Sequence, residues 1–235
     1  MTTNENIFAV ENPEQPITLF TDVKKSIKSL YTSGKPIVIL DLDQTLISAE
    51  ESDEFMKSAN RLKADKYKSF EMEENGESFF HVFERPGLQE FLDYLFREFT
   101  VCVWTAASKD YALFIIEKFI LASKPERVLD FIFFSYHCDL SSKCSKTKRT
   151  KDLSMLEEFY NIEGYKKGRM MIIDDYDDVY KSQPGECIAI YPFEFNNDGS
   201  ENDKVLVDMI PKLKKAKEYI LNSEGIRPAD IVNEG

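Results

Sequence analysis

Short apolar segments of strand length alternate along this chain with longer segments whose apolar residues recur at helical spacing. The apolar segments are rich in β-branched and aromatic residues, and they read PIVIL (36–40), TVCVWTA (100–106), FIFFS (131–135), RMMIIDD (169–175) and CIAIYP (187–192). Strands that are buried on both faces have this continuous apolar character. The alternation therefore predicts an α/β fold, namely a Rossmann-like doubly wound, mostly parallel sheet with helices on both faces.

Amphipathic spacing and capping residues place the expected helices. Helices are predicted over 21–34, 86–99, 109–122 and 152–160, and from Asp203 onward. On the last of these, one face carries Leu206, Met209, Ile210 and Leu213. Ser108 is the expected N-cap of the helix over 109–122, and Thr21 and Gly34 are the expected limits of the first helix.

One main domain is expected over residues 21–222, because a chain of 235 residues with 43% hydrophobic residues can build one sizeable core. Residues 49–84 interrupt the alternation with a charged stretch and with two partly alternating runs joined by Asn75-Gly76, which predict a β-hairpin flap. The two end segments, 1–20 and 223–235, show no clear period and are expected to be irregular.

The charge and the composition exclude several functions. Forty-two acidic against thirty basic residues give a net charge of −12, which opposes binding to nucleic acid or to an anionic membrane surface. The chain has only His81 and His137, so a histidine base or a multi-histidine metal site has almost no residues to use. Carboxylates must therefore carry any chemistry.

Signals for export or membrane insertion are lacking. No apolar run is long enough to span a bilayer, and the acidic start MTTNENIFAVENPEQ has neither the basic nor the apolar region of a leader. The cysteines are scattered, and Cys102 and Cys187 lie inside expected buried strands, where thiols act as small apolar groups. These observations predict a soluble intracellular protein of the nucleus or the cytoplasm.

Polar side chains follow three of the expected strands at the point where each strand ends. Asp41 and Asp43 follow the first strand, and Thr105 ends the second. Asp174 and Asp175 end the RMMIIDD segment. Ligands of open α/β sheets bind at the carboxyl ends of the strands, so we expect these side chains to converge on one crevice.

Asp41 is the expected nucleophile. A carboxylate can attack a phosphoryl group when a cation and neighbouring donors offset the charge, and the product is an aspartyl-phosphate. Residues two apart on an extended chain point to the same side, so Asp43 can face the same volume. A carboxyl group shifted toward protonation there could donate a proton to the leaving oxygen and then act as a base for water.

Mg²⁺ is the expected cofactor. Carboxylates arriving from two strand ends would repel one another without a cation, and an all-oxygen site that also keeps waters and a phosphate suits magnesium. The three equatorial oxygens of a phosphoryl group need donors in the transition state. The candidates are Thr45, Thr105 and Lys151, the last of which is expected to begin a helix after a loop with five basic residues.

Four motifs in this order resemble those of the haloacid dehalogenase superfamily: DLDQTL (41–46), WTAAS (104–108), KDLSML (151–156) and IIDD (172–175). The block ERPGLQEFLDYLFREFTVCVWTAASKDYA (84–112) is similar to the branch of small phosphatases, FCP/SCP-like or NLI-interacting-factor-like, that act on the C-terminal domain of RNA polymerase II. The resemblance covers about residues 35–195. It implies a fold without a large cap domain, which favours a phosphorylated protein or peptide over a small metabolite.

The resemblance also implies roles for individual residues. Asp41 would be the nucleophile, Asp43 the acid and base, and Thr105 and Lys151 the phosphate ligands. The implied magnesium ligands are Asp41, Asp175 and the main-chain carbonyl of Asp43, with Asp174 as an additional or outer ligand. Aspartate at position 175 is more typical of the larger polymerase phosphatases, because the small branch often has asparagine there.

Together these residues predict a magnesium-dependent phosphatase of phosphoserine or phosphothreonine in proteins, plausibly in the repeats of RNA polymerase II. Two alternatives stay open: a non-catalytic binding or scaffold protein of the same fold, and a phosphatase of nucleic-acid ends or small metabolites. Taken singly, the Asp41–Asp43 pair could be a polar turn, Thr105 a strand-end hydroxyl and Lys151 a solvated side chain. The four motifs in order outweigh these readings.

The remaining polar motifs favour ordinary structural roles. The run KCSKTKRTK (143–151) is expected to form an exposed loop, with docking of an acidic or phosphorylated peptide as the alternative. Residues His137, Cys138 and Cys144 lack a fourth partner at zinc-site spacing and are expected to pack as ordinary side chains. Trp104 is predicted to lie in the core, and Asp177 and Asp178 on a helix surface.

Overall fold

The computed structural model of the protein describes residues 34–57, 61–74, 76–144, 149–159, 166–222 and 227–233. The strands are β1 (Ile37–Leu40), β2 (Ile47–Glu51), β3 (Ser69–Glu74), β4 (Glu77–Glu84), β5 (Thr100–Trp104), β6 (Ile132–Phe133), β7 (Met170–Asp174) and β8 (Cys187–Ala189). The α-helices are α2 (Ser52–Lys57), α3 (Arg61–Ala64), α4 (Leu88–Glu98), α5 (Lys109–Ile115), α6 (Ser135–Cys144), α7 (Asp177–Ser182), α8 (Val205–Asn222) and α9 (Pro228–Asn233). Two π-helical segments, Ile116–Leu121 and Met155–Phe159, and a 3-10 turn, Ser200–Asn202, complete the described elements.

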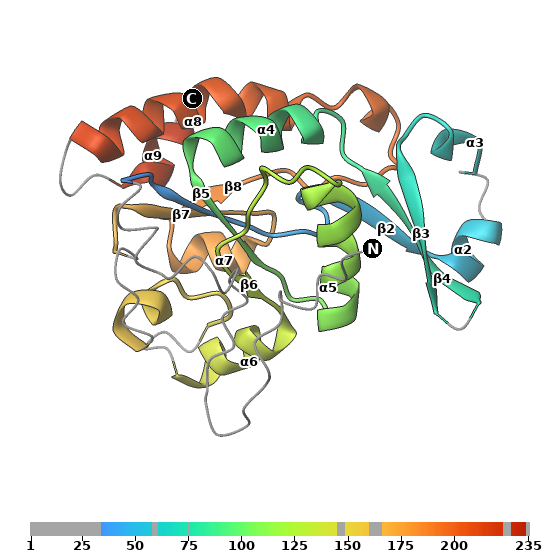
Figure 1. Ribbon diagram of the computed structural model, residues 1–235, viewed down its shortest axis with the longest axis horizontal. Coiled ribbons are helices and arrows are strands. Elements are labelled where there is room, and N and C mark those ends of the chain that lie inside the picture. The colour runs from blue at the N-terminus through green and yellow to red at the C-terminus, as the bar shows by residue number, and fades with distance from the viewer. Residues whose placement is uncertain are drawn as a thin grey trace.

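Within the described residues, five parallel strands form the central sheet in the order β6-β5-β1-β7-β8 (Figure 1). Strand β1 lies in the middle, and Ile37 pairs with Thr100 of β5 on one side and with Met170 of β7 on the other. The expected parallel α/β sheet is confirmed. Because these three strands run in the same direction, their carboxyl ends lie side by side at one edge of the sheet.

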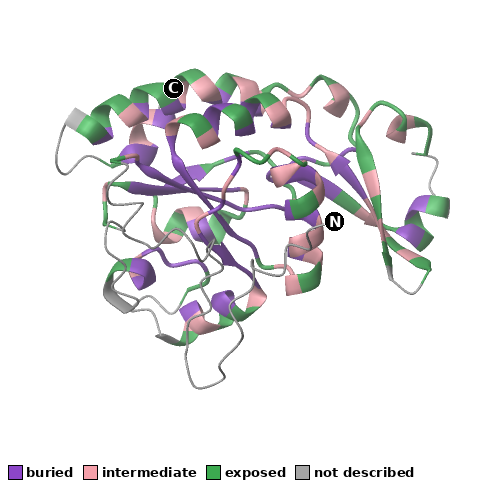
Figure 2. Cartoon of the chain, viewed as in Figure 1, coloured by how far each residue is buried: buried purple, intermediate pink, exposed green. Residues whose placement is uncertain are grey.

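Alternate residues of each strand face two different layers of helices. Val38 and Leu40 point into a core with α4, α5, α8 and α9, whereas Ile37 and Ile39 point into a core with the segment Met155–Phe159 and α7. Figure 2 shows the strands buried between these layers. Burial of each large aliphatic side chain contributes about 1.5–3 kcal/mol, so the sheet is a rigid support for residues at its edge.

A second, antiparallel sheet in the order β2-β4-β3 projects to one side of the central sheet (Figure 1). The expected hairpin is confirmed as β3 and β4, although Asn75 of its turn lies outside the described residues. Strand β2, which pairs with β4, was not expected. Phe83 of β4 stacks on Phe195 with ring centroids 3.9 Å apart, and this contact joins the flap to the segment that follows β8.

Two predicted strands are shorter than expected. The FIFFS segment contributes only β6, because α6 begins at Ser135 and the Phe134 amide donates a hydrogen bond to Nδ1 of His137 at 3.1 Å. The CIAIYP segment contributes only β8, after which the chain leaves the sheet. Apolar content alone cannot fix the length of an edge strand, because only one neighbour holds it.

Two other predictions are wrong at particular residues. Lys151 does not begin a helix: it lies in a turn with φ +53°, and the segment Met155–Phe159 is π-helical. The last residues are not irregular throughout, because α9 buries Ala229 and Val232 against the sheet side of α8. The expected irregular segment 1–20, and the helix expected before Gly34, lie outside the described residues.

The predicted burial of several residues is confirmed, but the exposed loop expected over 143–151 is wrong at its two ends: Lys143 and Cys144 belong to α6, and Lys151 is buried. Trp104, Cys102 and Cys187 are buried. His137 is also buried and stacks on Phe133 with ring centroids 4.1 Å apart. Of the basic run, residues 145–148 lie outside the described segments. No helix in the described part of the chain is long and apolar enough to cross a membrane.

Candidate active site

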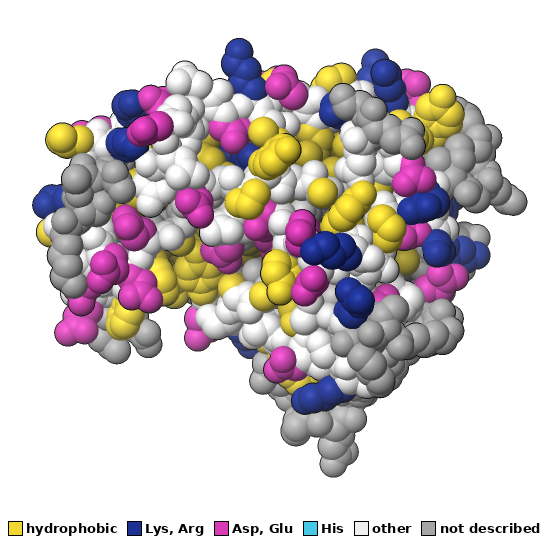
Figure 3. Space-filling view, turned by 180° about the vertical axis from the view of Figure 1, so that it is seen from behind, with side chains coloured by type: hydrophobic (Ala, Val, Ile, Leu, Met, Phe, Trp, Pro, Cys, Tyr) yellow, Lys and Arg dark blue, Asp and Glu magenta, His cyan; other side chains and the backbone are white. Residues whose placement is uncertain are grey.

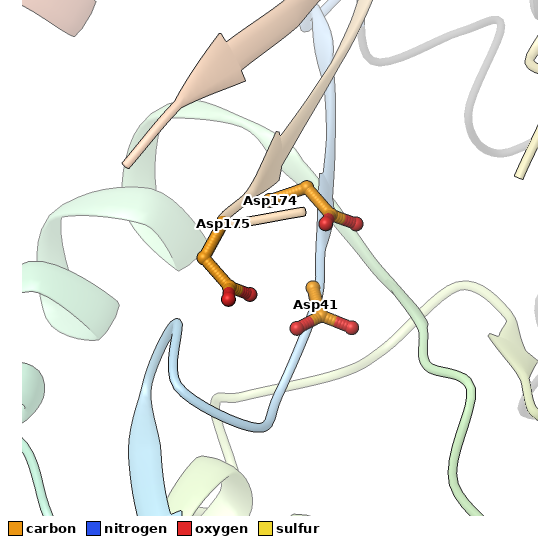
Figure 4. Close-up of side chains that lie close together, drawn as sticks. All are labelled: Asp41, Asp174 and Asp175. Atoms are coloured by element: carbon orange, nitrogen blue, oxygen red, sulfur yellow. The ribbon is translucent and has the colours of Figure 1, made fainter. Parts of the chain in front are cut away.

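Three carboxylates meet at the carboxyl edge of the sheet. Asp41 directly follows β1, Asp174 ends β7, and Asp175 is the next residue; Figure 4 shows their side chains turned toward a common space. One oxygen of each carboxylate lies within 4.8 Å of the others. Parallel pairing of β1 with β7 brings these residues together, as the sequence predicted for strand ends. A set of three carboxylates this close can hold a metal ion.

Lys151 bridges two of these carboxylates. Its ammonium group donates hydrogen bonds to Oδ1 of Asp41 and to Oδ2 of Asp174, the second at 2.7 Å. Lys151 is 5% exposed and Asp174 is 1% exposed, so the side chains of Lys151, Asp41 and Asp174 form a buried network. Breaking a buried ion pair by removing one partner is strongly unfavourable, because it leaves an uncompensated charge in a site of low dielectric constant.

The electrostatics of this network follow from burial and from the packing of charges. Burial alone lowers the pKa of Lys151, but the negative charges of Asp41 and Asp174 outweigh it and raise that pKa. Burial raises the pKa of Asp174, the charge of Asp41 raises it further, and Lys151 opposes both. The pKa of Asp175 is also raised, first by burial and then by Asp41. A positive charge is thus favoured at the centre of the carboxylates.

Two side chains hold the turn that delivers Lys151. The φ of +53° is uncommon for a residue with a side chain and costs about 1–2 kcal/mol. Gln183, which follows α7, donates from Nε2 to the carbonyl of Lys151 at 2.8 Å and accepts from the amide of Leu153 at 3.0 Å. Ser141 of α6 donates to the carbonyl of Arg149 at 2.7 Å. Nothing in the motif KDLSML points to Gln183, which lies 32 residues later.

Replacing Gln183 by leucine is expected to lower kcat about tenfold, because both hydrogen bonds to the Lys151 turn are lost. The free energy of unfolding should fall by about 1–3 kcal/mol. Steady-state kinetics and urea denaturation measure the two effects. The matched variant Gln183→Glu keeps the acceptor and loses the donor, so its kcat should lie between those of Gln183→Leu and the wild type. If Gln183→Leu loses the expected stability but keeps the wild-type kcat, then Gln183 does not position Lys151 for catalysis.

Asp43 lies in a tight turn after β1. The amide of Gln44 donates to the carbonyl of Ile47 at 2.8 Å, and Gln44 has a φ of +57°. The hydroxyl of Tyr111, in α5, donates to Oδ1 of Asp43 at 2.6 Å. Burial is the main reason that the pKa of Asp43 is raised to about 6, and the hydrogen bond from Tyr111 opposes that rise. Asp43 is therefore set up to exchange a proton near neutral pH.

Tyr111 is a site residue that the sequence analysis missed. Its aromatic ring packs edge-on against Phe80 of β4, with ring centroids 5.4 Å apart, so the flap supports the partner of Asp43. Burial and the neighbouring Asp43 raise the pKa of Tyr111, and the phenol stays protonated as a donor. The only available signal was its position three residues after Ser108, in the first turn of a helix that starts at the carboxyl edge of the sheet.

Replacing Tyr111 by phenylalanine is expected to raise the pKa of Asp43, since the variant loses the hydrogen bond that stabilises the carboxylate. Proton donation fails as pH rises through the pKa of the donor, so the alkaline limb of the pH profile should move to higher pH. Single-turnover formation of the phosphoenzyme from an alkyl phosphoester measures that limb. A limb at the wild-type position in Tyr111→Phe would contradict the assignment.

Thr45 and Thr105 are both buried at the site but bond to protein groups. Thr45 donates from its hydroxyl to Oδ1 of Asp175 at 3.1 Å, and the hydroxyl of Thr105 accepts from the amide of Ala107 at 3.1 Å. Their role as phosphate ligands stays a prediction. Arg85, from the ERPG segment, donates to the carbonyl of Thr45 at 2.9 Å and to Asp203 at 2.9 Å.

The family model of the NLI interacting factor-like phosphatases matches residues 36–223 of the chain. The chain belongs to this family. As an NLI interacting factor-like phosphatase, it is a hydrolase that releases phosphate. The branch of the haloacid dehalogenase superfamily that the motifs indicated is confirmed.

Curated relatives agree with the family model. The CTD phosphatase-like protein 355R of Invertebrate iridescent virus 6 is 40% identical over 171 residues, covering 72% of this chain and 92% of the relative. The protein of the same description in Invertebrate iridescent virus 3 is 37% identical over 193 residues, covering 80% of this chain and all 100% of the relative.

Solved structures of similar fold include the RNA polymerase II CTD phosphatase Fcp1. A fission yeast Fcp1 variant bound to beryllium fluoride matches with a TM-score of 0.52 and 22% identity, over 82% of this chain. A second Fcp1 structure matches with a TM-score of 0.50 and 23% identity, over 89% of this chain. The matches span only 53% and 60% of those chains. They show that the NLI interacting factor-like phosphatase shares the Fcp1 fold.

Proposed function

We propose that this NLI interacting factor-like phosphatase is magnesium-dependent and hydrolyses phosphoserine or phosphothreonine in proteins, through an aspartyl-phosphate on Asp41. Phosphorylated C-terminal repeats of RNA polymerase II are the candidate substrate. The observation that carries the proposal is the placement of Asp41 at the end of β1, hydrogen bonded to Lys151 and two residues before a carboxyl group whose pKa is raised to about 6.

In the proposed first step, a carboxylate oxygen of Asp41 forms a bond to phosphorus while the ester P–O bond of the substrate breaks. Asp43, protonated, gives its proton to the departing serine or threonine oxygen. Lys151 meets the charge of the phosphoryl oxygens. Its ion pair with Asp174 orients the ammonium group, and the Gln183 hydrogen bonds fix the turn that carries it.

In the proposed second step, Asp43 is a carboxylate and takes a proton from water as the water oxygen attacks phosphorus. The bond between phosphorus and Asp41 breaks, and inorganic phosphate leaves. The same residue acts first as acid and then as base, which requires a pKa near neutral pH. The Tyr111 hydroxyl, which donates to Oδ1 of Asp43, holds the Asp43 carboxyl group in place during both steps.

The donor set fits a magnesium ion. Asp41, Asp174 and Asp175 offer oxygens within 4.8 Å of one another, and oxygen is the ligand that this cation prefers. The main-chain carbonyl of Asp43 is proposed as a further ligand, because it lies on the same turn. When bound, the cation offsets the negative charge of the nucleophile and of the phosphoryl group. The Thr45 hydroxyl, hydrogen bonded to Asp175, orients that ligand.

The alternatives that the sequence left open are less well supported. A non-catalytic scaffold has no need for a buried lysine between carboxylates or for a half-buried acid whose pKa is raised. Nucleic-acid ends are disfavoured by the net charge of −12, which repels polyanions. The names of the viral relatives and of Fcp1, which are CTD phosphatase-like proteins and CTD phosphatases, support a protein substrate.

A substrate panel tests this proposal. Phosphoserine and phosphothreonine peptides, 3′-phosphorylated oligonucleotides and sugar phosphates are compared in Mg²⁺ and in EDTA, with release of inorganic phosphate as the measurement. We expect kcat/KM to be highest for the phosphopeptides by about a hundredfold or more, and to vanish in EDTA. Preference for the oligonucleotides or the sugar phosphates, or turnover in EDTA, would contradict the proposal.

A further inference from the structure

A groove with a volume of about 960 Å³ shares one lining residue, Asp175, with the three-carboxylate site. Its walls come from α7, from β8 and the residues after it, from α8 and from α9. Because Asp175 belongs both to the groove and to the carboxylate cluster, the groove lies next to the candidate active site. A chain attached to a phosphate at Asp41 can therefore enter it.

Aromatic and aliphatic side chains form the groove surface. Tyr191 is 83% exposed and Tyr176 is 57% exposed, whereas Ile188 and Met209 are buried beneath. Exposed large aromatic side chains at the edge of a groove are common where a protein binds another chain, since each offers a large contact area with few torsions to fix. The groove is thus suited to an extended peptide that packs an apolar side chain between the two tyrosines.

The charged side chains of the groove are mainly acidic. Asp177 and Asp208 line it, and Lys212 is the basic residue among its described lining. Asp177 forms an exposed ion pair with Lys181 at 3.0 Å, so Asp208 is the stronger candidate for a charge on the ligand. Figure 3 shows hydrophobic, acidic and basic side chains together across the middle of one face of the molecule. The negative charge of the acidic side chains in the groove favours a basic residue in the bound chain.

We propose that this groove binds the segment of the phosphorylated protein substrate that flanks the phosphoresidue, with an apolar side chain against Tyr191 and Tyr176 and a basic side chain facing Asp208. The inference rests on the proposed function, because it names the substrate segment recognised next to the same site. A volume of about 960 Å³ is at the upper end for pockets that enclose compact ligands, and it accommodates a few extended residues.

The test compares two variants on matched substrates. Tyr191→Ala removes the exposed ring, and Tyr219→Ala, at a 51% exposed tyrosine of α8 outside the groove, is its control. The substrates are a phosphoserine peptide with apolar and lysine residues on both flanks, versions shortened on either flank, and para-nitrophenyl phosphate. We expect Tyr191→Ala to raise KM for the full peptide about tenfold and to leave kcat unchanged. Kinetics with para-nitrophenyl phosphate should not change in either variant.

A charge-reversal variant tests the role of the acidic residue Asp208 in the groove. Asp208→Lys is expected to raise KM about five- to tenfold for the lysine-flanked peptide and to lower KM for a peptide with glutamates in place of the lysines. A purely structural effect would raise both values of KM. Equal changes for the two peptides, or a KM for the full peptide that Tyr191→Ala leaves at the wild-type value, would overturn the inference.

Binding to the Asp41→Asn variant separates this inference from the proposed function. Fluorescence anisotropy measures the Kd of a labelled phosphopeptide, and the added Tyr191→Ala change is expected to weaken it about tenfold. If the wild type turns over no phosphopeptide but this weakening occurs, the proposed function is wrong and the groove is still the binding site of the phosphopeptide. If turnover occurs without weakening, the groove inference fails alone. A shift from dimer to monomer in Tyr191→Ala, with unchanged Kd, would assign the groove to a second copy.

Discussion

Replacing Asp41 by asparagine is expected to abolish turnover, with kcat falling by at least about ten-thousandfold. The amide has almost the same shape as the carboxylate, but its nitrogen and oxygen cannot form the acyl phosphate. The variant also removes one of the carboxylates that surround the candidate metal position. Lys151 keeps its ion pair with Asp174, so the buried lysine is not left without a partner.

The measurement is release of inorganic phosphate together with covalent labelling of the protein by a phosphopeptide in acid-quenched samples. The wild type should show a labelled phosphoenzyme and Asp41→Asn should not. Asp178→Asn is the matched control, because it removes an exposed carboxylate of α7 that lies outside both the carboxylate cluster and the groove lining. Retained turnover in Asp41→Asn, or labelling of this variant at the wild-type level, would contradict the aspartyl-phosphate mechanism.

Replacing Asp43 by asparagine is expected to slow hydrolysis of alkyl phosphoesters by about 10²- to 10⁴-fold, the range typical of general acid–base catalysis. Serine and threonine oxygens are poor leaving groups and need a proton, whereas a nitrophenolate leaves without one. The loss should therefore be much smaller for para-nitrophenyl phosphate in the phosphorylation step. The phosphoenzyme should then persist, because the base for water is also missing.

The pH dependence has a definite sign. Because the pKa of Asp43 is raised to about 6, the acid is protonated below that pH and loses its proton as pH rises through it. Phosphoenzyme formation from a phosphoserine peptide should therefore fall through this range in the wild type, and Asp43→Asn should show no such limb. Rapid-quench measurements between pH 5 and 8 follow it. Normal rates on the phosphoserine peptide in Asp43→Asn would remove Asp43 from this role.

Much of the fold follows from local patterns. The apolar segments over 36–40, 100–106 and 169–175 predicted β1, β5 and β7, because strands buried on both faces need continuous apolar residues. The amphipathic spacing that begins at Leu206 predicted α8 for a similar reason. Elements held mainly by long-range contacts were missed. Strand β2 depends on pairing with β4, and α9 depends on packing against α8 and the sheet.

The residues of the candidate site also fall into two groups: those that local patterns predicted and those that depend on long-range contacts. Asp41, Asp43, Asp174 and Asp175 were predicted because strand ends of a parallel sheet share one edge, which is a property of topology that the sequence pattern already contains. Tyr111 and Gln183 were not predicted, because each acts through a hydrogen bond to a residue that lies 68 or 32 positions away. Such contacts depend on how α5 and α7 pack onto the sheet.

The sequence by itself determined the class of fold, the family and the carboxylates at the strand ends, since these depend on periodicity and on motifs that are local in the chain. Tertiary structure alone decided the state of those carboxylates. It buried Lys151 between Asp41 and Asp174 through a turn of positive φ, and it raised the pKa of Asp43 by enclosing it. Burial and charge separation are properties of packed elements, so they become defined only when the distant segments meet.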